Sequence, residues 1–176
     1  VIIEWGIMKQ LGSHAYIAPI LKRLALDDST YCFLEMPLRG ERTLAKVIEH
    51  TRLSVDQTRS IMRCIMSAIE YAHQMRGIVH RDLTPTNIIV RDNGMEADII
   101  DWGLASDHKH NAPVGDHFVQ SPWCRSPEVW RGESYSAAMD MWSIGCIFFE
   151  MLVGSPIWSG YTEQDIAADI QTFDLT

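Results

Sequence analysis

The sequence predicts an α+β fold, in which long helical segments occur together with short strand-like runs. Apolar residues recur at helical spacing through residues 54–77, which predicts a long amphipathic helix that ends at a glycine. Residues 136–153 are apolar on nearly every side, which is typical of a buried central helix. The apolar runs at residues 88–90 and 97–100 have the length of strands.

The helices and strands near the N-terminus follow from similar patterns. Residues 3–11 show a helical stripe of apolar side chains, and residues 14–20 have the pattern of a loop that leads into a strand. A further strand is predicted at residues 31–37, where it ends in a turn. Ser54 and Gln57 have the spacing of a capping box, so the long helix is expected to begin immediately after Ser54.

Composition excludes several classes of protein. The 176 residues are enough for about one domain with a sizeable core, and the net charge of −8 contains no block of like charges. We therefore expect no nucleic acid and no membrane as the main partner. No apolar run approaches the ~20 residues that span a bilayer, and the N-terminus does not have the pattern of a signal peptide. The four cysteines lie far apart, which favours reduced thiols in the cytoplasm or the nucleus.

Residues 80–90 carry the polar side chains on which the functional prediction depends. Asp82 can accept a proton from a substrate hydroxyl, and Asn87, five residues later, can hold a magnesium ion. Asp101 follows a predicted strand directly, so its carboxylate is presented at a rigid strand end. Two oxygen ligands from separate loops suit magnesium, which keeps several waters and binds phosphate oxygens. This arrangement predicts phosphoryl transfer.

These motifs resemble those of the eukaryotic protein kinases. Residues 80–87 read His-Arg-Asp-Leu-Thr-Pro-Thr-Asn and are similar to the family's catalytic loop, and Asp-Trp-Gly at residues 101–103 is similar to its magnesium-binding turn. Residues 121–128, Ser-Pro-Trp-Cys-Arg-Ser-Pro-Glu, most resemble the group of cyclin-dependent, MAP and casein kinase 2-type kinases. The Asp-x-Trp-Ser-x-Gly pattern at residues 140–145 is similar to the family's central helix.

The resemblance implies a partial, two-lobed kinase fold. Residues 1–36 would be a remnant of the small lobe, and residues 37–176 most of the mainly helical large lobe, cut after the start of the helix that follows the central one. The Gly-rich loop and the ATP-binding lysine would lie upstream of residue 1. We therefore expect this piece by itself to be inactive and to expose apolar surface.

The resemblance also implies the cofactors ATP and Mg²⁺, protein substrates, and an unidentified regulatory subunit as a further candidate partner. The implied roles are catalysis by Asp82, Asn87 and Asp101; ATP binding by Glu4, Leu34, Glu35, Met36 and Thr84; magnesium binding by Asn87 and Asp101; substrate binding by Ser121 and Arg125; and regulation through Arg81 and Asp116. Within these, Ser121 would bond Asp82, and Leu34 would be the gatekeeper beside the adenine.

Three structural roles are implied as well. Asp140 would anchor the backbone of the catalytic loop, and Trp102, His80 and Met8 would stack in an apolar spine that links the lobes. His73 is expected to be a structural or surface histidine. Glu4 would pair with the upstream lysine that grips the phosphates. The alternative for Glu4 is a solvated glutamate near a helix start.

Two departures from the family pattern concern activity and its control. Thr84 stands where serine/threonine kinases usually carry a lysine, and a neutral hydroxyl supplies no charge to the transferred phosphate. We expect roughly a ten-fold lower rate and not a complete loss. The activation segment contains no phosphorylatable pair, so Asp116 is expected to substitute partly for phosphate by pairing with Arg81, with Arg125 as a further candidate partner. The alternative for Asp116 is a solvated loop residue.

Three functions remain open from the sequence. The favoured one is a serine/threonine protein kinase. The second is a pseudokinase that scaffolds partners, which Thr84 favours and the presence of Asp82, Asn87 and Asp101 disfavours. The third is a small-molecule phosphotransferase of related fold, against which the Ser-Pro-Glu closure argues. Proline-directed specificity is in doubt because Pro122 replaces an arginine of that group.

Overall fold

The computed structural model describes residues 2–25, 32–107, 119–158, 160 and 162–172. The helices are α1 (Ile2–Leu11), α2 (Leu44–His50), α3 (Val55–Glu70), α4 (Pro127–Trp130), α5 (Ala138–Val153) and α6 (Glu163–Thr172). One π-helical and two 3₁₀ turns are η1 (Tyr71–Arg76), η2 (Pro85–Asn87) and η3 (Pro122–Cys124). The strands are β1 (Lys22–Ala25), β2 (Cys32–Glu35), β3 (Arg42–Thr43), β4 (Ile78–Val79), β5 (Ile88–Val90), β6 (Ala97–Ile99) and β7 (Ser106–Asp107).

The strands form small antiparallel sheets, so the predicted α+β class is confirmed. β1 pairs with β2, β5 lies between β3 and β6, and β4 pairs with β7. The hairpin of β5 and β6 matters most for function, because the segment that contains η2 leads into β5 and the predicted magnesium turn follows β6.

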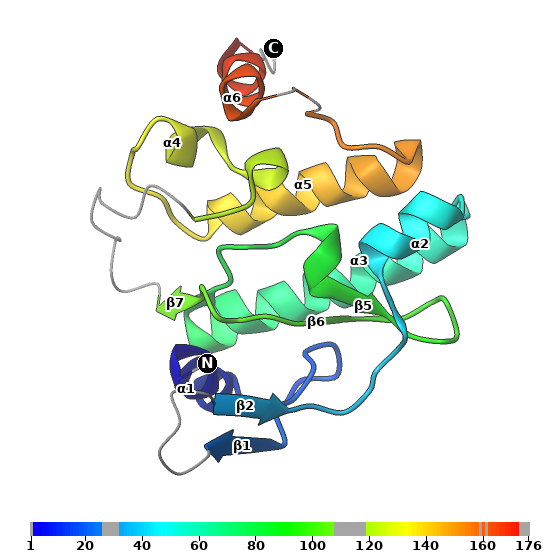
Figure 1. Cartoon of the computed structure of the whole chain (residues 1–176), viewed down its shortest axis with the longest axis vertical. Coiled ribbons are helices and arrows are strands. Elements are labelled where there is room, and N and C mark those ends of the chain that lie inside the picture. Colours follow the sequence, from blue (N-terminus) through cyan, green and yellow to red (C-terminus); the bar gives the residue numbers. More distant parts are fainter. Residues whose placement is uncertain (1, 26–31, 108–118, 159, 161, 173–176) are drawn as a thin grey trace.

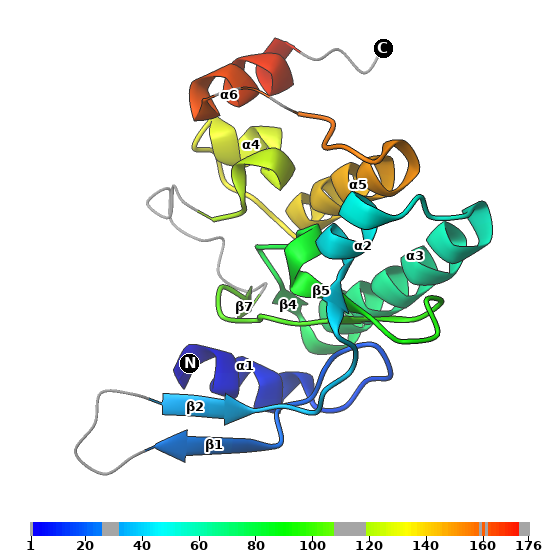
Figure 2. The ribbon, with the colours of Figure 1, turned by 45° about the vertical axis from the view of Figure 1, so that its right-hand side comes forward.

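The elements are stacked along the long axis of the molecule. Figures 1 and 2 show α1 and the β1–β2 hairpin at one end, α4 and α6 at the other, and α3 with α5 between them. The segment before β1 is tied to the middle layer, because Ile17 bridges Ile99 of β6 and the backbone N–H of Ala18 donates to the Ile99 carbonyl at 3.1 Å. The division of the chain at residue 36 stays a prediction.

The capping box of α3 is confirmed. The Gln57 N–H donates to the Ser54 hydroxyl at 3.2 Å, and the Ser54 N–H donates to the Gln57 side-chain oxygen at 3.0 Å. The predicted helix does not stay α-helical to its end, however, since its last turn is the wider π-turn η1. A π-turn shifts the side chains that follow it, and here η1 carries His73. Gly77 then ends the helix in the left-handed conformation at φ +66°.

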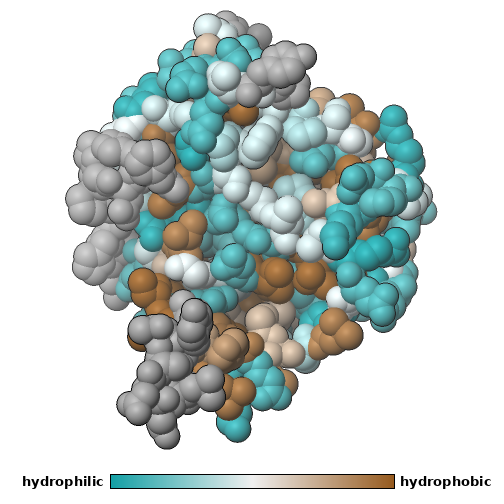
Figure 3. Space-filling model, viewed as in Figure 1, coloured by the Kyte–Doolittle hydropathy of each residue, from teal (hydrophilic) through white to brown (hydrophobic). Residues whose placement is uncertain are grey.

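The α5 helix is buried on one face only, which corrects the prediction of burial on nearly every side. Met141, Phe148 and Leu152 keep 43%, 43% and 48% of their surface exposed, because no described element packs fully over them. The expected exposure of apolar surface is thus confirmed. On the face shown in Figure 3, small hydrophobic areas are interleaved with hydrophilic ones.

Two buried clusters form the core of the described residues. The larger one joins α1, α2, α3, β5, β6 and one face of α5. The smaller one contains Val79, Val119, Val129 and Met139, and it lies where the segment before η3 meets the start of α5. None of the described helices is long and apolar enough to cross a membrane.

Candidate active site

Asp140, in the first turn of α5, holds the backbone that precedes Asp82, as predicted. Its carboxylate is fully buried and accepts hydrogen bonds from the N–H groups of His80, at 2.8 Å, and Arg81, at 3.0 Å. The oxygen that receives the His80 bond also lies 2.8 Å from Nε2 of His73. His73 is therefore structural, as expected, but its contact with Asp140 could not be inferred from the sequence.

His80 is a buried, neutral side chain beneath the catalytic loop. Its Nδ1 accepts the N–H of Asp82 at 3.2 Å, and its Nε2 lies 3.1 Å from the Ile100 carbonyl, so the proton is on Nε2. Burial lowers the pKa of His80 below its ordinary value. The ring lies 4.6 Å from that of Trp102, which shares the main core with Met8, consistent with the predicted spine.

The Asp82 carboxylate is held from two sides. Oδ1 accepts hydrogen bonds from the backbone N–H of Ser121, at 3.1 Å, and from its hydroxyl, at 3.0 Å. Oδ2 accepts the side-chain N–H of Asn87 at 3.2 Å, while the same amide nitrogen donates to the Asp82 carbonyl at 2.9 Å. The structure therefore brings together three of the predicted site residues around one carboxylate.

Asp101 lies next to this group through a backbone contact. The N–H of Ile100 donates to the Asn87 carbonyl at 3.0 Å, so the residue that follows it is held beside Asn87. The Asp101 side chain is exposed, which leaves its carboxylate available to a cation. Because the Asn87 amide nitrogen is bound to Asp82, the oxygen of that amide is turned away from Asp82. An amide oxygen and a carboxylate are a donor set that magnesium accepts.

Three residues around Asp82 have a left-handed backbone. Arg81, Asp101 and Gln120 have φ angles of +67°, +59° and +65°, and they are the only non-glycine residues with positive φ in the described ranges. Each costs about 1–2 kcal/mol. Gln120 also donates its N–H to the Arg81 carbonyl at 3.0 Å. Such strain persists where surrounding contacts fix the backbone, and here it is concentrated at one site.

Glu4 extends the acidic character of the site. Burial and, next, the negative charge of Asp101 raise the pKa of Glu4, while a hydrogen bond from the Trp102 backbone lowers it. Two carboxylates that repel each other in this way favour a cation between or beside them. The role of Glu4 in a nucleotide site and its pairing with a lysine both remain predictions.

Thr84 is turned into the protein. It is 5% exposed, and its hydroxyl lies 2.7 Å from that of Thr86. Both line a cavity of about 220 Å³ together with Ser121 and Glu150, whose carboxyl pKa is raised by burial. Thr84 is therefore adjacent to the site but supplies it with no charge.

The predicted roles of Arg81 in regulation and of Arg125 in substrate binding stay predictions, and both residues make contacts within the protein. Arg81 donates to the Leu104 carbonyl at 2.6 Å and to the Tyr135 hydroxyl at 2.9 Å. Arg125 is buried, donates to the carbonyls of Val119 and Gln120, and lies 3.4 Å from a Glu163 carboxylate oxygen. Asp116 lies outside the described residues.

The predicted adenine-binding residues belong to a separate part of the molecule. Leu34 and Glu35 pair with Arg23 and Lys22 between β2 and β1, and Met36 follows β2 directly. Within the described part of the chain, no hydrogen bond joins these three residues to Asp82, Asn87 or Asp101. Their role in nucleotide binding stays a prediction.

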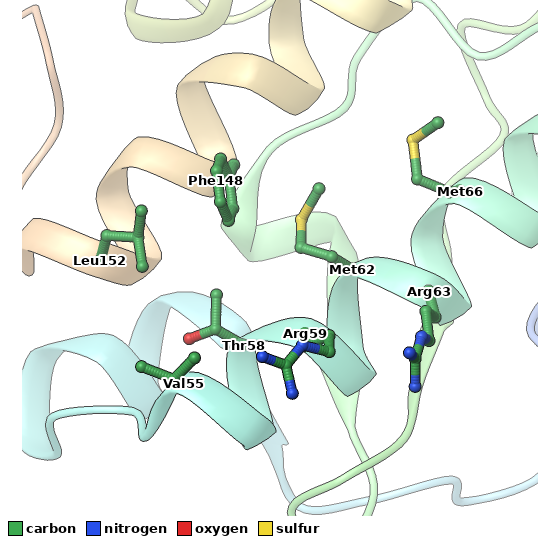
Figure 4. A pocket seen from close by; sticks show the side chains of 8 residues that line it. All are labelled: Val55, Thr58, Arg59, Met62, Arg63, Met66, Phe148 and Leu152. Carbon is green, nitrogen blue, oxygen red and sulfur yellow. The ribbon is translucent and has the colours of Figure 1, made fainter.

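A larger cavity has no part in this site. Figure 4 shows its walls, which are side chains of α3 and α5, among them Met62 and Phe148. Its volume is about 490 Å³, and its lining is mostly apolar. Its lining contains no carboxylate and none of the predicted site residues, so it is separate from the predicted phosphoryl-transfer site.

Comparison with known proteins agrees with this geometry. A model of the protein kinase domain matches residues 1–175. The chain is 35% identical to cyclin-dependent kinase 2 of Caenorhabditis elegans over 153 residues, 85% of this chain and 41% of that protein. It is 34% identical to mitogen-activated protein kinase 12 of Mus musculus over 149 residues, 83% of this chain and 38% of that protein.

A third relative is calcium-dependent protein kinase 5 of Plasmodium berghei (strain Anka), with 34% identity over 167 residues, 94% of this chain and 29% of that protein. The chain thus spans less than half the length of these relatives. It belongs to the protein kinase family, and the predicted likeness to cyclin-dependent and MAP kinases is confirmed.

Proposed function

We propose that the protein is a serine/threonine protein kinase that transfers the γ-phosphoryl group of ATP to protein hydroxyls. The observation that carries the proposal is the Asp82 carboxylate, held by both donors of Ser121 and by the Asn87 amide. A carboxylate fixed in this way can accept a hydrogen bond from an acceptor hydroxyl and then take its proton. A positioned general base contributes about 10²–10⁴-fold to a rate.

Asn87 and Asp101 are the residues that would hold magnesium. The side-chain oxygens of Asn87 and Asp101 are of the kind that this ion prefers. When bound, magnesium neutralises charge on the phosphate oxygens. Asp82 would act on the acceptor side, where the backbone held by Asp140 and the bond from the Asn87 amide nitrogen to the Asp82 carbonyl keep it in place.

The pseudokinase remains the second candidate, and Thr84 is the observation that favours it. Thr84 is buried and its neutral hydroxyl is bonded to that of Thr86, so it makes no bond from a charged donor to a phosphate. The loss of such a bond, about 1.5–3 kcal/mol against roughly 1 for a neutral one, slows transfer without abolishing it. The complete set of Asp82, Asn87 and Asp101 therefore weighs more than this one change.

Control of the enzyme belongs to the same proposal. Activity without phosphorylation of the activation segment is supported by its composition, because residues 101–128 contain hydroxyl side chains only at Ser106, Ser121 and Ser126. Ser121 and Ser126 lie in the closing motif. A regulatory subunit is suggested by the name of the relative cyclin-dependent kinase 2. The four free cysteines support a cytoplasmic or nuclear location.

Substrate preference follows from the turn beside Ser121. The Gln120 carbonyl accepts Nε and Nη2 of Arg125 at 3.2 and 3.0 Å, so it is not free to receive an N–H from a substrate backbone. A substrate with proline directly after the phosphorylated residue has no N–H at that position, so it loses no hydrogen bond when the Gln120 carbonyl is occupied. We therefore include tolerance of proline at this position in the proposal, despite Pro122.

The test uses the full-length protein. Transfer of labelled γ-phosphate from MgATP to a serine/threonine peptide library is expected, and Asp82→Asn should abolish it. The peptides would give the preference after the acceptor. Absence of transfer, with MgATP still bound, would refute the kinase and support the pseudokinase. Absence of both transfer and nucleotide binding would refute both.

A further inference from the structure

The residue before Ser121 has an unusual environment. Gln120 is 3% exposed, its backbone is left-handed, and all its polar groups have protein partners. The side-chain nitrogen donates to the Met139 carbonyl at 3.0 Å, to the Ser143 hydroxyl oxygen at 2.8 Å and to the Cys124 carbonyl at 3.3 Å. The side-chain oxygen accepts the Ser126 N–H at 2.9 Å. We call this set of contacts the amide network.

The amide network joins the substrate turn to α5, the helix that also carries Asp140. Ser143 reinforces the connection, since its hydroxyl donates to the Cys124 carbonyl at 2.8 Å. The second core cluster, with Val119 and Met139, supplies apolar surroundings. Water is therefore excluded from these bonds, and an amide without its partners in such a place would be costly.

The backbone of Gln120 connects the amide network to the catalytic group. Its N–H donates to the Arg81 carbonyl, and the next residue, Ser121, binds the Asp82 carboxylate twice. The left-handed φ of Gln120 aims Ser121 at Asp82, and a non-glycine residue keeps that φ only under outside constraint. The side-chain bonds of Gln120 provide the constraint.

We infer that Gln120 is a positioning residue for catalysis, which holds Ser121 against Asp82 through neutral hydrogen bonds to α5. This inference rests on the proposed kinase function. It adds a reason why the substrate turn is held in place without phosphorylation. The substrate turn is set by an uncharged, buried side chain, so its geometry does not require a phosphate. The network consists entirely of described residues.

The test compares variants of the full-length protein. Gln120→Leu keeps similar volume but removes both amide atoms, and Gln120→Glu keeps the acceptor but places a carboxylate oxygen against the carbonyl oxygens of Met139 and Cys124. Ser143→Ala removes one partner. Ile61→Val, in the main core and away from the turn, is the matched control for a small general loss of stability.

Each variant is assayed for kcat and KM with a serine peptide, for the Kd of MgADP, and for hydrogen exchange of the amides of residues 119–126. Gln120→Leu should lower kcat about ten-fold or more, with the Kd of MgADP unchanged and faster exchange at residues 119–126. Gln120→Glu should be at least as impaired. The effects of Gln120→Leu and Ser143→Ala should be non-additive, since they share a bond.

Four outcomes decide between these possibilities. Equal kcat in Gln120→Leu, Ile61→Val and the unmodified protein would overturn the inference, as would unchanged exchange at residues 119–126. Additive effects of Gln120→Leu and Ser143→Ala would overturn the shared network. If the unmodified protein transfers no phosphate, the proposed function fails, and the exchange data still show whether Gln120 holds the turn.

Discussion

Replacement of Asp140 by asparagine removes the charge that holds the catalytic loop while keeping the shape of the side chain. Asp140 accepts hydrogen bonds from the N–H groups of His80 and Arg81, and Nε2 of His73 lies 2.8 Å from one of its oxygens. An asparagine has one acceptor oxygen. If the asparagine oxygen takes the place of Oδ2, it keeps the contacts with the His80 N–H and with Nε2 of His73. The amide NH₂ then faces the N–H of Arg81, so two donors oppose each other.

The expected loss follows from these contacts. A hydrogen bond to a charged group contributes about 1.5–3 kcal/mol, and an unpaired buried donor adds about 1–3 kcal/mol. The lost hydrogen bond and the unpaired donor are partly the same effect, so their energies do not add fully. We therefore expect Asp140→Asn to lower the free energy of unfolding by about 3 kcal/mol. For a domain of about 150–250 residues, that corresponds to a fall in Tm of about 6–12 °C.

The assay is urea and thermal unfolding of the full-length protein, with Asp56→Asn as the control. Asp56 forms an exposed ion pair with Arg59 at 2.9 Å, and loss of such a pair changes stability by about 0.5 kcal/mol or less. At temperatures where Asp140→Asn is folded, kcat should still fall about ten-fold or more, because Arg81 no longer keeps its left-handed backbone. A Tm within about 2 °C of the unmodified protein would refute the reasoning.

Three further predictions concern the charges of the site. Thr84→Lys should raise kcat about ten-fold by supplying the missing charge to the phosphate, and an unchanged or lower kcat would show that Thr84 is not the handicap. Because burial lowers the pKa of His80 below 6.5, the unfolded chain binds more protons below that pH, so stability should fall as the pH falls from about 6.5. An NMR titration of the His80 ring with a midpoint at or above 6.5 would contradict this. MgADP at about 100 times its Kd should stabilise the protein by about 2.7 kcal/mol, and Asp101→Asn should lose the magnesium-dependent part of the shift in Tm. An equal shift with and without Mg²⁺ in the unmodified protein would argue against Asp101 as a metal ligand.

Local signals in the sequence were sufficient for many elements of the fold. The capping box of Ser54 and Gln57 predicts the start of α3, because both hydrogen bonds join residues three positions apart. The five-residue interval between Asp82 and Asn87 likewise predicts a shared site, since one short loop carries both. The order of the motifs then identified the family. The same resemblance predicted that Asp140 anchors the backbone of the catalytic loop, as it does at His80 and Arg81.

Other features could not be read from local pattern. The α3 helix ends in a π-turn, and α5 leaves one apolar face exposed, whereas periodicity predicts a regular helix and a helix buried all round. Periodicity reports which side chains avoid water, but it does not report which elements are present to cover them.

The sequence by itself determined the protein family, because the side chains that mark it lie in short motifs with fixed spacing. Only the tertiary structure decided how those side chains are aimed. His73 reaches Asp140 across 67 positions of the chain, and the Gln120 amide reaches Ser143 across 23. The left-handed backbones of Arg81, Asp101 and Gln120 are unfavourable by themselves and exist because such distant contacts fix them. Those contacts depend on how α5 packs against two loops, and that packing is a property of the folded chain as a whole.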